Sequence, residues 1–427
     1  MGENIVSFEV REKILRERVL LVPKLRPGTR LLKLVVAMLF LSALVGAAQA
    51  QVELGIDVLK AHEFSILQGK RVGLVTNHTG IDADGVKTRK ILAAAKGVHL
   101  VALFAPEHGL DGIVGAGKYV ASRKDKLTGL PCYSLFGPTR KPTPAMLKGL
   151  DVLVYDMQDI GSRSYTYIST MAKCMEAAGE AGIPFVVLDR PNPLGGLRIE
   201  GPPMEPDWIS FVGQLPVPYV HGMTTGELAQ MANAKGWVQP KCNLTIVKMH
   251  NWQRTMTWKQ TGLRWIATSP NIPYPTSPLY YVATGLVGEI EGIETGCGGT
   301  EPFQIAACKW ADADKFTASM RSLDLPGVTF STYVGKGFQG SRLRIDPNSS
   351  ADLCALGVYI LATAQKTAPH SLFSGPASKY DIFYKCYGST SIRTAIEKGV
   401  PPAKIVQSWA PANERFASER KPYLLYP

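Results

Sequence analysis

The fold is decided by two short apolar runs, Asp151-Val-Leu-Val-Tyr-Asp156 and Phe185-Val-Val-Leu-Asp189, which flank a helical stretch from Tyr165 to Ala181. Neither run alternates apolar with polar residues, and continuous apolar strands are typical of a parallel sheet that is covered on both faces. The stretch between them has apolar residues three and four positions apart, which predicts a helix. Together the three segments predict a strand, a helix and a second, parallel strand.

The same alternation continues on both sides of this unit. We expect further strands at residues 71–77, 99–104, 244–247 and 264–267, and helices at 88–95 and 224–232. Residues 51–270 are therefore predicted to form an α/β domain, a Rossmann-like open parallel sheet. No G-x-G-x-x-G follows the first strand and no P-loop motif occurs, so no cofactor is expected.

The pattern changes in the last third of the chain. It predicts a helix near residues 282–289, a glycine-rich loop at 292–299, strands near 329–334 and 342–345, and a long helix at 351–364. Residues 271–427 are therefore predicted to form a smaller α+β domain that completes a cleft with the first.

The amino terminus has the pattern of an export signal. Residues 1–33 hold eight Lys or Arg and four Glu, an apolar run spans Leu34 to Val45, and Ala48-Gln49-Ala50 follows as a cleavage site. A retained membrane anchor is the alternative, although the run is shorter than the roughly 20 residues that a span needs. The segment is long for a signal, so translation could also start at Met38. We expect residues 1–50 to be a signal peptide and the protein to be periplasmic or secreted.

Composition narrows the class of protein. The chain is 45% hydrophobic and 19% charged, which excludes a disordered chain. Four of its twelve net positive charges lie in residues 1–33, and the rest of the chain has no Lys/Arg block, so nucleic-acid binding is not expected. The seven cysteines have no metal spacing; most are expected to be buried, with one or two disulfides left open.

Polar residues gather at the carboxyl ends of the predicted strands, where open parallel sheets bind ligands. Five such segments follow one another along the chain: 76–80, 106–109, 156–163, 189–193 and 269–273. Each alone could be a turn or a helix cap. Five on one edge of a sheet favour a catalytic cleft.

Glu107 is the strongest catalytic candidate, because it directly follows an apolar strand, and such a partly desolvated carboxyl can donate a proton near neutral pH. A helix cap or a structural salt bridge is the alternative. Most glycoside hydrolysis needs a second carboxyl group, for which Asp156 and Asp159 are nearest by topology. Arg163 and Arg190 are bidentate cations that could hold a substrate carboxylate.

Other chemistries have weaker support. Tyr165 and Tyr167 could contact a ligand or belong to the core. The histidines at positions 78, 108 and 221 lack zinc-site spacing, so no metal is expected. There is no G-x-S-x-G elbow, but Ser162 and Ser164 leave a serine esterase open.

Several motifs in order resemble one known family. They are Phe104-Ala-Pro-Glu-His-Gly109, Asp156-Met-Gln-Asp-Ile-Gly-Ser-Arg-Ser-Tyr-Thr-Tyr167, Leu188-Asp-Arg-Pro-Asn-Pro-Leu-Gly-Gly196, Glu200-Gly201 and Ser269-Pro-Asn-Ile-Pro273. Over residues 54–427 the chain resembles the NamZ-type exo-β-N-acetylmuramidases. The resemblance implies a Rossmann-like domain and a smaller domain with the active site between them, release of N-acetylmuramic acid from peptidoglycan fragments, and Glu107 as the catalytic residue. One loop departs from the family pattern: Cys297-Gly-Gly-Thr300 stands where Gly-Arg-Gly-Thr is common.

The leading hypothesis is an exo-acting glycoside hydrolase of cell-wall turnover or recycling, with Glu107 as general acid/base and Asp159 as the second carboxyl group. N-acetylmuramic acid bears a lactyl carboxylate, for which Arg163 is the expected cation. The full set of expected substrate contacts is Asn77, His108, Asp156, Arg163, Tyr165, Tyr167, Arg190, Asn192, His221 and Asn271. The alternatives are a secreted serine esterase or amidase of cell-wall acyl groups and a non-catalytic muropeptide-binding protein. The expected partners are peptidoglycan-derived saccharides, with no nucleic acid and no membrane span after signal cleavage.

Overall fold

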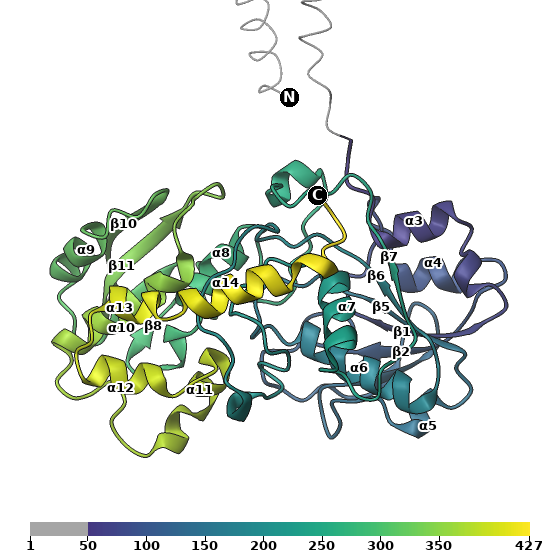
Figure 1. The fold of residues 1–427 in the computed structure, drawn as a ribbon, viewed down its shortest axis with the longest axis horizontal. Helices are drawn as coiled ribbons and strands as arrows, with labels where there is room; N and C mark the ends of the chain where they lie inside the picture. The colour runs from purple at the N-terminus through teal and green to yellow at the C-terminus, as the bar shows by residue number, and fades with distance from the viewer. Residues whose placement is uncertain (1–49) are drawn as a thin grey trace, which may run out of the picture. The chain divides into compact units, whose positions relative to one another are not determined.

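A seven-stranded sheet runs through the first half of the described chain (Figure 1). The computed structural model describes residues 50–427, and the predicted signal peptide lies almost wholly outside them. The strand order is β3-β4-β2-β1-β5-β6-β7, and all neighbours are parallel except β3 and β4. The strands are β1 Arg71–Thr76, β2 His99–Ala105, β3 Arg123–Lys124, β4 Pro131–Ser134, β5 Val152–Asp156, β6 Phe185–Leu188 and β7 Leu244–Val247. The predicted open, mainly parallel sheet is confirmed.

Both faces of the central strands of this sheet are buried, which explains why those strands are continuously apolar. Successive residues of β5 point to opposite sides: Val152 and Val154 pack with the helices α3 (Gly55–Ala61) and α4 (Thr88–Ala94). Leu153 and Tyr155 pack in the other core, with α6 (Tyr167–Ala181) and α7 (Thr225–Lys235). A short helix, α5 (Pro144–Leu147), precedes β5.

The second half of the chain forms a four-stranded antiparallel sheet, in the order β10-β11-β9-β8, with helices around it. Its strands are β8 Ile293–Glu294, β9 Ile305–Cys308, β10 Val328–Gly335 and β11 Phe338–Ile345. Its helices are α8 Ser277–Thr284, α9 Ala313–Arg321, α10 Leu353–Thr367, α11 Asp381–Tyr387, α12 Ser391–Glu397, α13 Pro402–Gln407 and α14 Ala410–Glu419. Short 3-10 helices are η1 Ser65–Leu67, η2 Pro206–Trp208, η3 Trp258–Thr261, η4 Val287–Glu289, η5 Ala377–Tyr380 and η6 Lys421–Tyr423.

The carboxyl terminus returns to the first sheet, and α14 runs back towards α7 (Figure 1). The Tyr426 hydroxyl donates to Asp189 Oδ2 over 2.6 Å, directly after β6, and accepts the Met249 N–H. The Arg254 N–H donates to the Pro427 carbonyl over 2.9 Å. Residues 51–427 form one compact unit, so the domain boundary at residue 270 stays a prediction.

One expectation about local structure is wrong, and the question of disulfides, which the sequence left open, is answered. Residues 264–267 form no strand, because β7 is the edge of the sheet and the Trp265 side chain instead packs edge-on against Trp258 and donates to the Ile272 carbonyl. The seven cysteines, all within the described residues, form no disulfide; six are buried and Cys297 is exposed.

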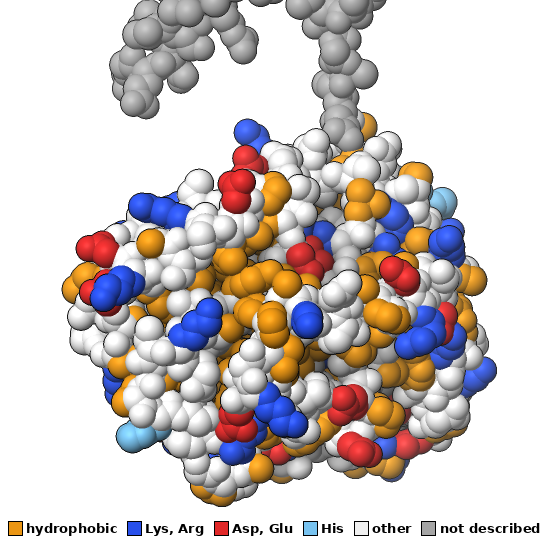
Figure 2. Space-filling view, turned by 60° about the vertical axis from the view of Figure 1, so that its left-hand side comes forward, with side chains coloured by type: hydrophobic (Ala, Val, Ile, Leu, Met, Phe, Trp, Pro, Cys, Tyr) orange, Lys and Arg blue, Asp and Glu red, His pale blue; other side chains and the backbone are white. Residues whose placement is uncertain are grey.

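Charges of both signs are interspersed on the face of the molecule shown in Figure 2. Some exposed charges of the described residues form ion pairs, as Arg71–Asp151 and Lys141–Glu180 do. That face carries no extended patch of a single sign.

Candidate active site

A cavity of about 730 Å³ lies at the carboxyl ends of β2, β4 and β5. One wall comes from the segments that follow these strands, and the other from α8, η4, the loop after β8 and α11. Its volume falls within the roughly 300–1,000 Å³ typical of small-molecule sites. Residues from the carboxyl edge of the sheet and from the second half of the chain therefore line one cavity together.

Glu107 enters this cavity from a tight turn. The Gly109 N–H donates to the Pro106 carbonyl over 3.0 Å, and His108 has a φ of +66°. Turns of this kind usually place Gly or Asn at that position, so a histidine there is strained. The His108 Nδ1 atom lies 2.7 Å from the Val114 carbonyl, which ties the turn to the following loop. Strain of this sort is commonly retained at functional sites.

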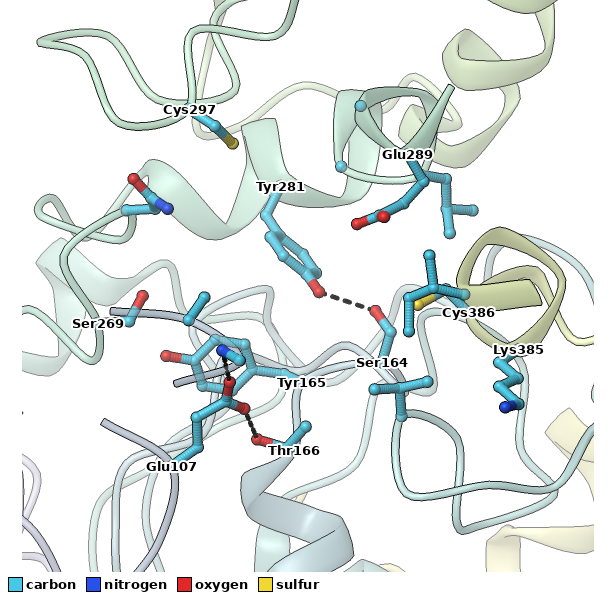
Figure 3. Close-up of a pocket in the computed structure, with 18 of the residues that line it drawn as sticks. Glu107, Ser164, Tyr165, Thr166, Ser269, Tyr281, Glu289, Cys297, Lys385 and Cys386 are labelled. Atoms are coloured by element: carbon cyan, nitrogen blue, oxygen red, sulfur yellow. Dashed lines mark hydrogen bonds between the residues drawn. The ribbon is translucent and has the colours of Figure 1, made fainter. Parts of the chain in front are cut away.

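The Glu107 carboxylate is held by two hydrogen bonds (Figure 3). The Gly117 N–H donates to Oε1 and the Thr166 hydroxyl donates to Oε2, each over 2.7 Å. The side chain is buried, with 8% of its surface exposed. One bond comes from the loop after β2 and the other from the start of α6. Two segments that are distant in the sequence therefore fix the carboxylate.

Glu289, in η4, is the other acidic side chain that lines the cavity. In Figure 3 it lies across the cavity from Glu107. Desolvation by the surrounding wall raises its pKa. Sequence reasoning missed this residue; the signal available was its position at the end of a predicted helix, beside the glycine-rich loop.

Hydroxyl groups line the cavity between the two carboxyl groups (Figure 3). Ser164 Oγ lies 2.9 Å from the Tyr281 hydroxyl and donates to the Tyr219 hydroxyl over 3.0 Å. Burial raises the pKa of Tyr281 well above its usual value, so its phenol stays protonated at neutral pH. These groups can donate and accept hydrogen bonds from a sugar.

Four of the twelve predicted site residues line this cavity: Glu107, His108, Tyr165 and Asn271. The Tyr165 hydroxyl donates to Thr268 Oγ1 over 2.8 Å. Asn271 Oδ1 accepts the Gly298 N–H over 3.0 Å, so it contacts the loop that departs from the family pattern. The two cations of the lining, Arg140 and Lys385, were not predicted.

Arg163 does not line the cavity, and the prediction that it holds the substrate carboxylate is wrong. Its guanidinium is fully buried and donates to four backbone carbonyls over 2.7–3.1 Å. Two of them belong to Pro202 and Val217, and the other two, Cys386 and Tyr387, end α11. A cation is favourable at the carboxyl end of a helix, where carbonyls lack partners within the helix. Arg163 therefore fastens α11, which forms part of the cavity wall, to the first half of the chain.

Asp156 and Arg190 also lie outside the cavity and pair with each other. Arg190 Nε lies 2.6 Å from Asp156 Oδ1, and Nη2 lies 3.0 Å from Oδ2. Both side chains are buried. This bidentate pair joins the ends of β5 and β6. The two residues therefore have a structural role, and the prediction that they contact the substrate is corrected.

The remaining predicted residues form hydrogen bonds inside the packed strand ends. Asn77 Oδ1 accepts from Thr79, the Tyr167 hydroxyl donates to the Thr268 carbonyl, and Asn192 donates to the Met223 carbonyl. Together with Asn192, Asp159 and His221 line a separate pocket that has almost no free volume for a ligand. Burial raises the pKa of Asp159 to about 7 and lowers that of His221 to about 3. The prediction that Asp159 is the second catalytic carboxyl group is therefore corrected. So is the prediction of substrate contacts by Asn77, Tyr167, Asn192 and His221.

Comparison with known proteins places this chain in a family. Residues 72–276 match the N-terminal family model of exo-β-N-acetylmuramidase NamZ, and residues 279–426 match the C-terminal one. The chain is 41% identical over 389 residues to the peptidoglycan β-N-acetylmuramidase NamZ of Bacillus subtilis (strain 168), covering 89% of this chain and 92% of that protein.

Two crystal structures share the fold, both of DUF1343 family proteins from Bacteroides fragilis NCTC 9343. One is 43% identical with a TM-score of 0.82, and the other is 29% identical with a TM-score of 0.70. Each comparison covers 88% of this chain and 99% of the other. The chain therefore belongs to the NamZ exo-β-N-acetylmuramidase family.

Proposed function

We propose that this protein is an exo-acting glycoside hydrolase that releases N-acetylmuramic acid from the non-reducing ends of peptidoglycan fragments. The observation that carries the proposal is Glu107, fixed by two hydrogen bonds at the cavity that the two halves of the chain form. Membership of the NamZ family supports the chemistry. A cavity of about 730 Å³ suits a compact ligand better than a long polymer, which supports removal of a terminal sugar.

Glu107 and Glu289 are the two carboxyl groups of the proposed reaction. One carboxylic acid gives its proton to the glycosidic oxygen as the bond from that oxygen to the anomeric carbon breaks. Water supplies the oxygen that bonds to the anomeric carbon, and its proton passes to a carboxylate. Glu289 lines the same cavity and supplies the second carboxyl group. Glu107 keeps its general acid/base role, with its position fixed by Gly117 and Thr166.

The serine esterase alternative is not favoured. Ser164 lines the cavity, but its hydroxyl pairs with two tyrosine hydroxyls. Ser162 is fully buried, and its hydroxyl lies 3.4 Å from that of Ser164. Within residues 50–427 no histidine forms a hydrogen bond to either serine, whereas a serine nucleophile needs a neighbouring base.

We also propose that the protein acts on the cell wall after export, because its first 50 residues have the pattern of a signal peptide. Those residues lie almost wholly outside the described structure. None of the helices in the described part of the chain combines the length and the apolar character required to cross a membrane.

A pair of defined saccharides tests the proposal. One has N-acetylmuramic acid at its non-reducing end, and the other carries one additional N-acetylglucosamine at that end. We expect mass spectrometry to detect free N-acetylmuramic acid from the first saccharide only. Internal cleavage of both would contradict exo action, and stoichiometric binding without any product would favour a muropeptide-binding protein.

A further inference from the structure

Among residues 50–427, the cavity holds one cation that forms no ion pair with a carboxylate. Arg140 and Lys385 are its basic lining residues, and Lys385 Nζ pairs with Asp381 over 2.5 Å. None of the carboxylates within residues 50–427 forms an ion pair with Arg140, whose side chain is exposed. An arginine without an ion pair at the wall of this cavity is available to an anionic ligand.

Two aromatic rings hold the Arg140 guanidinium in place. Its central carbon lies 4.0 Å from the ring centroid of Phe136 and 4.4 Å from that of Phe211. Both phenylalanines line the same cavity, and their ring centroids are 6.0 Å apart. Contacts of this kind use the faces of the guanidinium and leave the N–H groups at its edge free to donate. The edge of a guanidinium matches a carboxylate with two parallel hydrogen bonds.

The backbone around Arg140 is fixed by hydrogen bonds. The Phe136 carbonyl accepts the Val120 N–H over 2.9 Å, and the Phe136 N–H donates to Ser134 Oγ over 3.1 Å. On either side of Arg140, the Thr139 hydroxyl and the backbone of Lys141 bond to each other. The loop therefore presents Arg140 from a constrained position, which reduces the entropy lost when a ligand binds.

A ligand that carries a carboxylate needs a cation in this cavity, because the cavity also holds two acidic side chains. An ionised carboxylate at Glu107 or Glu289 repels an anionic ligand in the same space. N-acetylmuramic acid differs from N-acetylglucosamine by its lactyl ether, which ends in a carboxylate. With Arg163 committed to backbone carbonyls and Lys385 paired with Asp381, Arg140 is the uncompensated cation that this wall offers among residues 50–427.

We propose that Arg140, held between Phe136 and Phe211, binds the lactyl carboxylate and so selects muramic acid over glucosamine at this site. The inference rests on the proposed function and adds the residue that determines its substrate. It concerns recognition and assigns Arg140 no part in bond cleavage.

Two probes isolate the carboxylate: N-acetylmuramic acid and its lactyl methyl ester, which has the same sugar without the charge. Calorimetry on the wild type should find the acid bound more tightly than the ester. Arg140→Gln should weaken binding of the acid roughly 10- to 100-fold, the usual range for one charge-assisted contact, and leave the ester within about twofold. The affinity of Arg140→Lys for the acid should lie between those of the wild type and Arg140→Gln, because lysine keeps the charge but cannot form two parallel hydrogen bonds.

Lys141→Gln is the matched control. It removes the same charge from the next residue, but its Nζ pairs with Glu180 over 2.7 Å at the surface. This variant should keep the wild-type preference for the acid. Equal binding of acid and ester by the wild type, or an undiminished preference in Arg140→Gln, would overturn the inference.

Turnover of an aryl β-N-acetylmuramide by the same variants separates the two proposals. Arg140→Gln should raise KM and change kcat little. If no variant and no wild-type sample turns the muramide over, the proposed function fails, yet the binding comparison still decides the role of Arg140.

Discussion

Replacing Arg163 with methionine should destabilise the protein rather than weaken substrate binding directly. The side chain is fully buried, and its four hydrogen bonds join α11 to residues 202 and 217. Burial lowers the pKa of Arg163 to about 10, so the group is still charged at neutral pH. The variant therefore removes a buried cation and leaves four carbonyls without their donor.

The size of the effect follows from two opposed contributions. Four buried carbonyls without partners cost about 1–3 kcal/mol each, while the variant recovers several kcal/mol because no guanidinium is desolvated. The net loss is about 3–5 kcal/mol. For roughly 380 residues the unfolding entropy is about 0.8 kcal/mol per kelvin, so the melting temperature should fall by about 4–6 °C.

Thermal unfolding and kinetics together provide the assay. Arg140→Met makes the same chemical change at an exposed position and should shift the melting temperature by less than about 1 °C. Arg163→Lys keeps the charge with fewer hydrogen-bond donors, so its melting temperature should lie between those of the wild type and Arg163→Met. An Arg163→Met protein with wild-type melting but a strongly raised KM would refute the structural role and restore the predicted substrate contact.

Three further predictions concern single side chains. Glu289→Gln should lower kcat by about 100-fold or more with little change in KM, and it should remove one limb of the pH–rate profile; unchanged kcat would exclude Glu289 as the second carboxyl. Asp159→Asn should keep activity and flatten the pH dependence of unfolding in denaturant: burial raises the folded-state pKa from 3.8 to about 7, so this group contributes stability at low pH that is lost as the pH rises through 7. An inactive Asp159→Asn protein with normal melting would contradict its exclusion from the site. Tyr426→Phe should cost about 1–3 kcal/mol in urea unfolding, because Asp189 and the Met249 N–H each lose a partner; an unchanged midpoint would show that the terminus adds no stability there.

The parallel sheet could be predicted because burial on both faces leaves a plain signal in the sequence. β1, β2, β5, β6 and β7 all fall where continuous apolar runs were found. The short strands β3 and β4, of which β3 forms an edge of the sheet, carry no such run. The apolar residues of 264–267 resemble a strand but form none, and Trp265 packs against Trp258 instead.

The candidate site could be predicted only in part, because polar residues at strand ends have two uses that look alike in sequence. Glu107 faces the cavity, whereas Asp156 and Arg163 satisfy partners inside the protein. Which use applies depends on side-chain packing between distant segments. Arg140 and Glu289 line the cavity from segments about 150 residues apart, and no local sequence pattern predicts that they share one cavity.

The most direct test of the account is the rate of hydrolysis of an aryl β-N-acetylmuramide by the wild type and by Glu107→Gln. The substitution keeps the shape of the side chain and removes its proton transfer, so kcat should fall by about 10²- to 10⁴-fold while the melting temperature stays near that of the wild type. A Glu107→Gln protein that hydrolyses the muramide at close to the wild-type rate would contradict the central claim that this cavity is the active site.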